Sequence, residues 1–205
     1  KIYLDNYLQE SSPGGPRSQA TQDAINNRIK KGSLLVNYTG HGGVLGWAQE
    51  RILEIEQIQS WDNQAMPLFM TATCKFSYFD DPSKMSAGEY VLLNPNGGTI
   101  GLLSTTRLVY SAPNYNLNNK FINVLFEKNN NEYPTLGQIF KKTKQLSGSG
   151  MNNRNFTLLG DPALKLAYPK LNIETTEIGD TLKALETVTI DGKIVNDYGL
   201  YDFNG

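Results

Sequence analysis

The sequence predicts an α/β protein built on a mainly parallel sheet. Three stretches are apolar enough for buried strands, namely residues 33–38, 66–73 and 99–104, and the second of them shows no alternation. Segments with helical periodicity separate these stretches, and a strand–helix–strand order implies right-handed parallel crossovers. Beyond Tyr168-Pro169 the helical pattern stops, which indicates a separate β segment.

The length of 205 residues leaves room for one large domain, or for one domain and a piece of another. We place the boundary at residue 169, so that residues 1–169 form the α/β unit and residues 170–205 begin an all-β domain that is cut short. The chain carries no signal peptide and opens directly on the strand-like residues 1–4. We therefore expect a piece of a longer protein.

Composition argues against a nucleic-acid partner and against a membrane-spanning segment. The formal net charge is −1, and no run rich in lysine and arginine is present, which argues against nucleic acid. No apolar run approaches the ~20 residues that a membrane-spanning helix needs. A single cysteine, Cys74, forms no disulfide within the chain.

The first elements are predicted from turn and capping residues. Residues 1–8 fit a short strand that ends near Asp5, and residues 11–16 contain two prolines and two glycines, which is typical of a loop. Thr21 can cap a helix that Gly32 is placed to end.

Three further helices are predicted from capping boxes and apolar stripes. Ser86 with Glu89 is a capping box that opens a short helix. Residues 115–128 form an amphipathic pattern. Thr135 with Gln138 opens the last helix.

The C-terminal third is predicted to contain loops and short strands. Residues 148–155 are a polar loop, and residues 156–159 and 164–167 are short strands. Apolar residues on both sides of Asp191-Gly192 predict a hairpin, because this dipeptide tolerates the positive φ values of a type I′ turn.

Two unique reactive residues follow two of the predicted strands. His41, the only histidine, ends the first strand in the run Gly40-His41-Gly42-Gly43, and Cys74 ends the second. Reactive groups gather beyond the carboxyl ends of strands in open α/β sheets. A neighbouring imidazole can generate a thiolate nucleophile. The sequence therefore predicts a Cys-His nucleophilic site, against the alternative of an inert buried cysteine and a turn histidine.

Glycines beside His41 suit a second requirement of acyl transfer. Gly42 and Gly43 let backbone N–H groups approach a substrate carbonyl, and with the N–H of Cys74 they can form an oxyanion hole. Other chemistries fit less well: one histidine and one cysteine leave only carboxylates to complete a zinc site, and no Gly-x-Ser-x-Gly elbow or phosphate-binding loop is present.

Asp80 and Asp81 leave two alternatives open, calcium ligands or a solvated turn. Few other oxygen acceptors lie nearby in the sequence, which favours the turn. We therefore expect no cofactor and no metal site, with calcium left open as a bound ion.

Several motifs together resemble the gingipain-type (C25) cysteine peptidases. They are the run from Asn37 to Gly42, Trp47, Ala72-Thr73-Cys74 and the run from Leu159 to Pro162. Within that family, three segments look most similar to the PorU-type sortases of the type IX secretion system. These segments are residues 43–51, 79–82 and 153–163.

The resemblance implies a caspase-like (caspase–haemoglobinase) three-layer sandwich that continues into an immunoglobulin-like domain. His41 and Cys74 would be the catalytic dyad, and the N–H groups of Gly42 and Cys74 the oxyanion hole. The pocket for the residue before the scissile bond would be lined by Thr105, Thr106, Arg107 and Tyr110. Trp47 and Glu50 would support the site. The acid that orients the histidine in gingipains, and their arginine-selecting acid, have no assignable counterpart here.

The resemblance also implies partners and a location. The substrates would be secreted proteins with a C-terminal sorting domain, the acceptor an anionic lipopolysaccharide, and the neighbours other type IX secretion components. The full-length protein would act at the outer-membrane surface of a Bacteroidetes-type bacterium.

Three alternatives stay open beside this interpretation. One is a gingipain-like secreted protease that hydrolyses its substrates. Another is a non-catalytic recognition fragment, and the third is a cytoplasmic caspase-like peptidase, against which the β segment counts.

Overall fold

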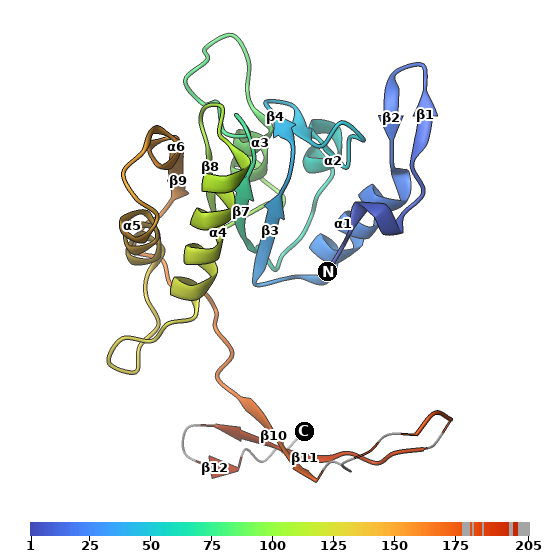
Figure 1. Ribbon diagram of the computed structural model, residues 1–205, viewed down its shortest axis with the longest axis vertical. Helices are drawn as coiled ribbons and strands as arrows, with labels where there is room; N and C mark the ends of the chain where they lie inside the picture. Colours follow the sequence, from blue (N-terminus) through green and yellow to red (C-terminus); the bar gives the residue numbers. More distant parts are fainter. Residues whose placement is uncertain (178–180, 182, 186, 197–198, 201–205) are drawn as a thin grey trace. The chain divides into compact units, whose positions relative to one another are not determined.

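A computed structural model of the chain describes residues 1–177, 181, 183–185, 187–196 and 199–200 (Figure 1). The chain divides into two compact units, Lys1–Leu166 and Ala167–Gly205. The first unit carries the predicted site, and each unit is described by itself below.

The first unit is built on a four-stranded sheet with the order β3-β7-β8-β9. The strands are β3 (Leu35–Thr39), β7 (Leu68–Ala72), β8 (Gly101–Thr105) and β9 (Phe156–Gly160). β3, β7 and β8 run parallel, and only β9 is antiparallel. Every residue of β7 and β8 is buried, as their continuous apolar sequences predict. The mainly parallel sheet is therefore confirmed.

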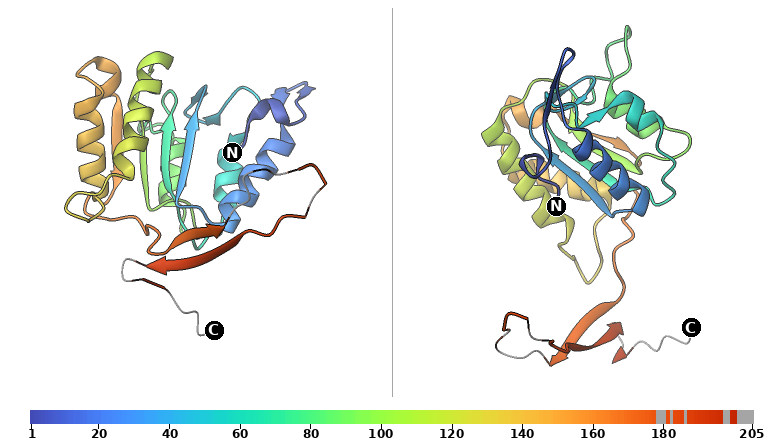
Figure 2. Two further views of the ribbon diagram at one scale, coloured as in Figure 1. Left: turned by 60° about the horizontal axis from the view of Figure 1, so that its bottom comes forward. Right: turned by 90° about the vertical axis from the view of Figure 1, so that its right-hand side faces the viewer.

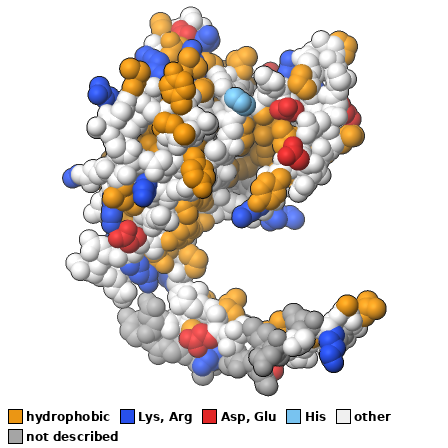
Figure 3. All heavy atoms as spheres, in the orientation of Figure 1, with side chains coloured by type: hydrophobic (Ala, Val, Ile, Leu, Met, Phe, Trp, Pro, Cys, Tyr) orange, Lys and Arg blue, Asp and Glu red, His pale blue; other side chains and the backbone are white. Residues whose placement is uncertain are grey.

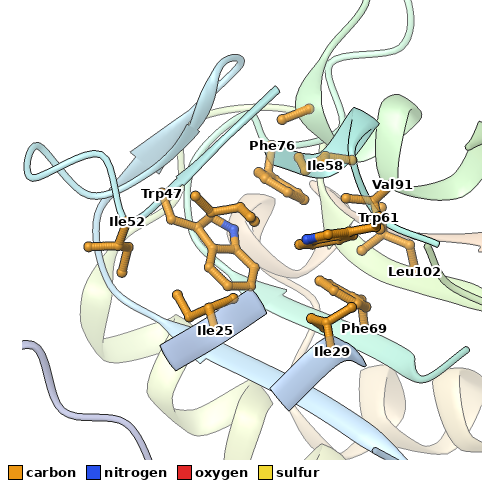
Figure 4. Packing of buried hydrophobic residues seen from close by; sticks show 12 residues of the cluster. Ile25, Ile29, Trp47, Ile52, Ile58, Trp61, Phe69, Phe76, Val91 and Leu102 are labelled. Carbon is orange, nitrogen blue, oxygen red and sulfur yellow. The ribbon is translucent and has the colours of Figure 1, made fainter. Parts of the chain in front are cut away.

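Three helices cover one face of this sheet: α1 (Gln19–Lys31), α2 (Ile55–Gln59) and α3 (Ala87–Leu93). Their apolar side chains pack around two tryptophans and form an aromatic core on this face (Figure 4). The residues of this core include Ile25, Ile29, Trp47, Ile58, Trp61, Phe69, Phe76, Val91 and Leu102.

Two helices, α4 (Ser111–Leu125) and α5 (Leu136–Leu146), cover the opposite face (Figure 2). Their inward stripes are fully buried and include Leu117, Phe121, Leu136 and Ile139. The arrangement is a three-layer α/β/α sandwich, so the predicted fold class is confirmed for this unit.

Local capping residues set most helix ends where the sequence predicts them. Ser86 and Glu89 form the capping box of α3, and Thr135 and Gln138 form that of α5. Gly32 ends α1 with a φ of 83°, a value that favours glycine. The predicted cap of α1 was wrong: Ser18 is its N-cap residue, and Thr21 lies buried inside the helix with its hydroxyl 2.8 Å from that of Ser18. α4 begins at Ser111, before the predicted residue 115.

The N-terminal prediction was wrong. Residues 1–8 contain a short 3-10 helix, η1 (Leu4–Asn6), instead of a strand. The predicted loop is a small hairpin of β1 (Glu10–Ser12) and β2 (Gly15–Arg17). The Ser12 hydroxyl donates to the Gly15 carbonyl, and Gly15 has a φ of 104°, so the glycine-rich sequence forms the hairpin's tight turn.

Two predictions near the end of the unit also need correction. The polar loop 148–155 contains a short helix, α6 (Met151–Arg154). Residues 164–167 form no strand. The Leu164 carbonyl instead accepts a hydrogen bond from the Leu136 N–H at the start of α5 (2.8 Å), so this segment satisfies a helix end.

The described part of the second unit is a three-stranded antiparallel sheet. It consists of β10 (Asn172–Glu177), β11 (Asp191–Asn196) and β12 (Gly199–Leu200). The predicted hairpin turn was wrong, because Asp191 and Gly192 lie inside β11 and Gly192 pairs with Thr175. The immunoglobulin-like assignment stays a prediction, and its positions 178–180, 182, 186, 197–198 and 201–205 lie outside the described residues.

Candidate active site

His41 and Cys74 stand at matching positions beyond two neighbouring parallel strands. The β3–β7 register pairs Leu35 with Leu68 and ends with Thr39 opposite Ala72, an offset of 33 positions. His41 and Cys74 are separated by the same 33 positions, and each lies two residues beyond the last pair. Since adjacent strands lie ~4.8 Å apart, the fold brings both residues to the same edge of the sheet.

The segments that carry the two residues touch directly at Gly42. A Cβ atom built on Gly42 would lie 2.6 Å from the Thr73 Oγ1 and 2.9 Å from the Gly46 carbonyl oxygen. Only glycine permits this approach, which packs the residue after His41 against the residue before Cys74. By contrast, no atom lies within 4 Å of a Cβ built on Gly43.

A small antiparallel sheet orients the backbone of this glycine segment. It consists of β4 (Gly42–Gly43), β5 (Gly46–Trp47) and β6 (Leu53–Glu54). The Ala48 N–H donates to the His41 carbonyl (2.8 Å), so the next opposed pair, Gly42 and Trp47, is of the non-hydrogen-bonded kind. The Gly42 N–H therefore points away from β5.

Tyr38 fixes the backbone of His41 through a hydrogen bond. Its hydroxyl donates to the His41 carbonyl (2.6 Å), and its ring stacks on Trp47 with centroids 4.2 Å apart and planes 7° from parallel. Burial, and secondly the charge of Glu50, raise the pKa of Tyr38 above its ordinary value, so the phenol stays protonated. Trp47 and Glu50 thus both affect Tyr38, and their role in supporting a site stays a prediction.

Several hydrogen bonds also hold the segment that carries Cys74. The Thr105 hydroxyl, fully buried in β8, donates to the Thr73 carbonyl. Lys75, directly after the cysteine, has a left-handed φ of 51°, and its N–H donates to the Arg107 carbonyl (3.2 Å). This sharp change of direction ends the strand and leaves the partly exposed Cys74 at the sheet edge.

The Cys74 thiol donates to the Val109 carbonyl oxygen at 3.5 Å. This contact joins the segment after β7 to the loop after β8.

The four predicted pocket residues occupy different environments. Thr105 is buried and reaches the site only through Thr73, whereas the half-buried Thr106 donates its N–H to the Asn155 carbonyl (2.9 Å). Tyr110 is 78% exposed, and its N–H donates to the Asn152 side chain (2.7 Å).

Arg107 forms a two-pronged ion pair with Asp80, with distances of 2.9 and 2.5 Å. This pair lowers the pKa of Asp80 and raises that of Arg107. It also joins the loop after Cys74 to the loop after β8, and the guanidinium lies 4.8 Å from the Tyr78 ring centroid. Arg107 is therefore already paired with a carboxylate, and Asp80 with a guanidinium.

An open hollow of about 620 Å³ lies beside the histidine segment. It is lined by residues 41–49, Arg51, Leu53 and Glu54. Figure 3 shows the His41 side chain, in pale blue, exposed at the surface. A ligand can therefore approach the histidine from solvent.

Among the residues that the structure describes, no cluster of three or more metal-ligating side chains occurs. Asp81, one of the two aspartates considered for calcium, accepts hydrogen bonds from the Ser83 N–H and hydroxyl instead. Within the same residues, no helix is both long and apolar enough to cross a bilayer.

Sequence reasoning missed Tyr38, Thr73 and the Val109 carbonyl. Their roles depend on which atoms meet across strands and loops, and a tyrosine or threonine inside a buried strand reads as an ordinary strand residue. The one available signal was sequence proximity, because Tyr38 precedes His41 by only three positions.

The model of peptidase family C25 matches residues 1–167. The chain also resembles solved structures. The complex of the pro- and mature domains of RgpB from Porphyromonas gingivalis matches with a TM-score of 0.64 and 20% identity, over 75% of this chain and 40% of that one. The crystal structure of the Arg-specific cysteine proteinase gingipain R (RgpB) matches with a TM-score of 0.63 and 22% identity, over 75% and 39%.

A third structure, described only as a protease, matches with a TM-score of 0.61 and 16% identity, over 84% of this chain and 46% of that one. At these identities the likeness shows the fold, and this chain spans less than half of each structure. No curated protein matches the chain.

Proposed function

The chain belongs to peptidase family C25, and on that premise we propose that it cleaves peptide bonds with Cys74 as nucleophile and His41 as general acid and base. One observation carries the assignment of these two residues. The β3–β7 register offset equals the spacing of the only histidine and the only cysteine, so both stand at one sheet edge.

The reaction uses the groups at this edge in two steps. The Cys74 thiolate attacks the substrate carbonyl carbon, and the carbonyl electrons move to oxygen, which the N–H groups of Gly42 and Cys74 stabilise. Collapse of this intermediate breaks the carbon–nitrogen bond, and the His41 imidazolium protonates the leaving amine. The result is a thioester on Cys74.

The thioester is then resolved by a second nucleophile. His41 removes a proton from water or from an amine, which attacks the thioester and releases the thiolate. Water gives hydrolysis, and an amine gives a new amide bond. The open hollow beside His41 gives either nucleophile access to the imidazole that would take its proton.

The finer part of the proposal is a PorU-like sortase of the type IX secretion system. Its cargo would carry a C-terminal sorting domain, its acceptor would be an anionic lipopolysaccharide, and it would work with other secretion components at the outer-membrane surface. Sequence resemblance supports this part, over residues 43–51, 79–82 and 153–163. Asp80 is paired with Arg107, so it is not free to bind a substrate arginine, which fits the absence of an assignable arginine-selecting acid.

The test uses the full-length protein in its own cell. Cys74→Ala should abolish removal of the sorting domain from secreted cargo, as measured by the mass of that cargo. Ser83→Ala, an exposed change in the same loop, is the matched control and should process cargo normally. Normal processing by Cys74→Ala would refute the assignment of the nucleophile.

The likeness to an Arg-specific proteinase favours one second candidate, a secreted protease that only hydrolyses. Mass spectrometry of the released cargo separates the two: a free carboxyl end indicates hydrolysis, and an amide to an amine indicates transfer.

The contact between the Cys74 thiol and the Val109 carbonyl favours another candidate, a non-catalytic recognition protein. For that candidate, iodoacetamide should alkylate Cys74 with a pH profile centred near ~8.5, as for a free thiol. A profile shifted to lower pH would support an activated thiolate.

A further inference from the structure

We propose that the hydroxyl groups of Tyr38 and Thr105 are positioning groups that aim the two oxyanion-hole donors. This inference rests on the proposed function, because it concerns the N–H groups assigned there to Gly42 and Cys74. Each of these N–H groups shares a peptide plane with the carbonyl of the preceding residue. Each of those two carbonyls accepts a hydrogen bond from a side-chain hydroxyl.

The Gly42 donor is aimed through the His41 carbonyl. That carbonyl accepts hydrogen bonds from the Tyr38 hydroxyl at 2.6 Å and from the Ala48 N–H at 2.8 Å. The structure contains no cis peptide bond among its described residues, and in a trans peptide the N–H points opposite to the carbonyl. Fixing the His41 carbonyl toward β5 therefore fixes the Gly42 N–H in the opposite direction.

The Cys74 donor is aimed in the same way through the Thr73 carbonyl. That carbonyl accepts the hydrogen bond of the Thr105 hydroxyl, which lies in β8, on the far side of β7 from β3. The Cys74 N–H consequently points away from Thr105. Gly42 packs against Thr73, so the two donors belong to adjoining segments.

Both hydroxyl groups are themselves held in place. Thr105 is fully buried in a central strand. The Tyr38 ring stacks on the buried Trp47, and its pKa is raised by burial, so its proton remains available for donation across the physiological pH range. Fixed donors cost no reorganisation when charge develops on the substrate oxygen, which is how an oxyanion hole accelerates acyl transfer.

The test removes each hydroxyl without removing its side chain. Thr105→Val and Tyr38→Phe are the test variants, and Thr105→Ser restores the hydroxyl. Thr71→Val is the matched control for the threonine, since its buried hydroxyl bonds to Ser104 (2.6 Å) in the same sheet. Tyr90→Phe is the control for the tyrosine, because Tyr90 packs against the same aromatic core.

Two rates are measured on the full-length protein. One is the turnover of a single fluorogenic peptide amide, chosen as the one that the wild type cleaves fastest in a panel with every residue type before the scissile bond. The other is alkylation of Cys74 by iodoacetamide, which requires the thiolate but no oxyanion hole.

We expect Thr105→Val and Tyr38→Phe each to lower kcat by about 10-fold to 100-fold with little change in KM, somewhat less than the ~10²–10³ lost with a whole donor. Alkylation should proceed at the wild-type rate, and Thr105→Ser should recover turnover. Thr71→Val and Tyr90→Phe should turn over like the wild type.

Three outcomes would overturn the inference. Turnover by Thr105→Val equal to that of Thr71→Val would show that the hydroxyl aims nothing. A parallel loss of alkylation would show general collapse of the site, and failure of Thr105→Ser to recover would assign the effect to packing. Failure of the proposed function would give a different result, because the wild-type protein would then cleave none of the amides. The inference would be refuted together with the proposed function in that case.

Discussion

Replacing Gly42 by alanine should disable the site, whereas the same change at the next residue should not. The new Cβ at position 42 would lie 2.6 Å from the Thr73 Oγ1 and 2.9 Å from the Gly46 carbonyl oxygen. Reaching an ordinary contact of 3.4 Å from 2.6 Å requires about 0.8 Å of movement. At position 43 nothing lies within 4 Å, so alanine meets open space.

Neither neighbour of the new Cβ can move aside easily. Thr73 is buried beside the nucleophile, and Gly46 has a φ of 153° with its own Cα facing the Leu53 carbonyl, so neither neighbour can give way. Overpacking of this kind costs roughly 1–3 kcal/mol of stability. A displacement near 1 Å of the donor at Gly42 should lower kcat/KM by about 10²-fold.

The assay pairs urea unfolding with turnover of peptide amides for Gly42→Ala, Gly43→Ala and the wild type. Gly43→Ala should unfold and react like the wild type. Equal stability and equal kcat/KM for the two alanine variants would refute the close packing of Gly42 against Thr73 and the role given to its N–H.

Two further predictions concern pH and backbone conformation. The pKa of Tyr38 is raised above its ordinary 10.0, first by burial and then by Glu50, so its contribution to stability is complete below pH 10 and is lost as pH rises beyond it. In unfolding series from about pH 9 to 11, the wild type should therefore lose stability more steeply than Tyr38→Phe, and equal slopes would contradict the raised pKa. Gly98→Ala should fail to fold, as judged by circular dichroism, because its Cβ would lie 2.0 Å from the Val91 carbonyl oxygen at a φ of 92°. Gly148→Ala, with a similar φ of 89° but open space, should lose only the ~1–3 kcal/mol of backbone strain, and equal losses for the two would contradict the packing at Gly98.

Two kinds of short-range signal were read correctly from the sequence, capping boxes and continuous apolar runs. The capping boxes at Ser86 and Thr135 form as predicted, since both partners lie within one helical turn. The apolar runs of β7 and β8 are buried on both faces for the reason that made them recognisable. These elements needed no knowledge of their neighbours.

Errors arose where a distant segment decides the local structure. Asp191-Gly192 favours a turn by itself, but pairing with β10 holds it extended within β11. Residues 164–167 have an apolar strand-like pattern, yet the Leu164 carbonyl accepts a hydrogen bond from the Leu136 N–H at the start of α5. Propensity is a weak prior, and tertiary hydrogen bonds outweigh it.

The sequence by itself determined the fold class and singled out the two candidate residues, because burial patterns and unique side chains are visible in one dimension. It also contained the spacing of 33 positions between His41 and Cys74, but it did not show that this spacing places the two residues side by side. Only the tertiary structure decided that the β3–β7 register has the same offset. Register depends on how both faces of two strands pack, and contacts such as Thr105 to Thr73 exist only once that register is chosen.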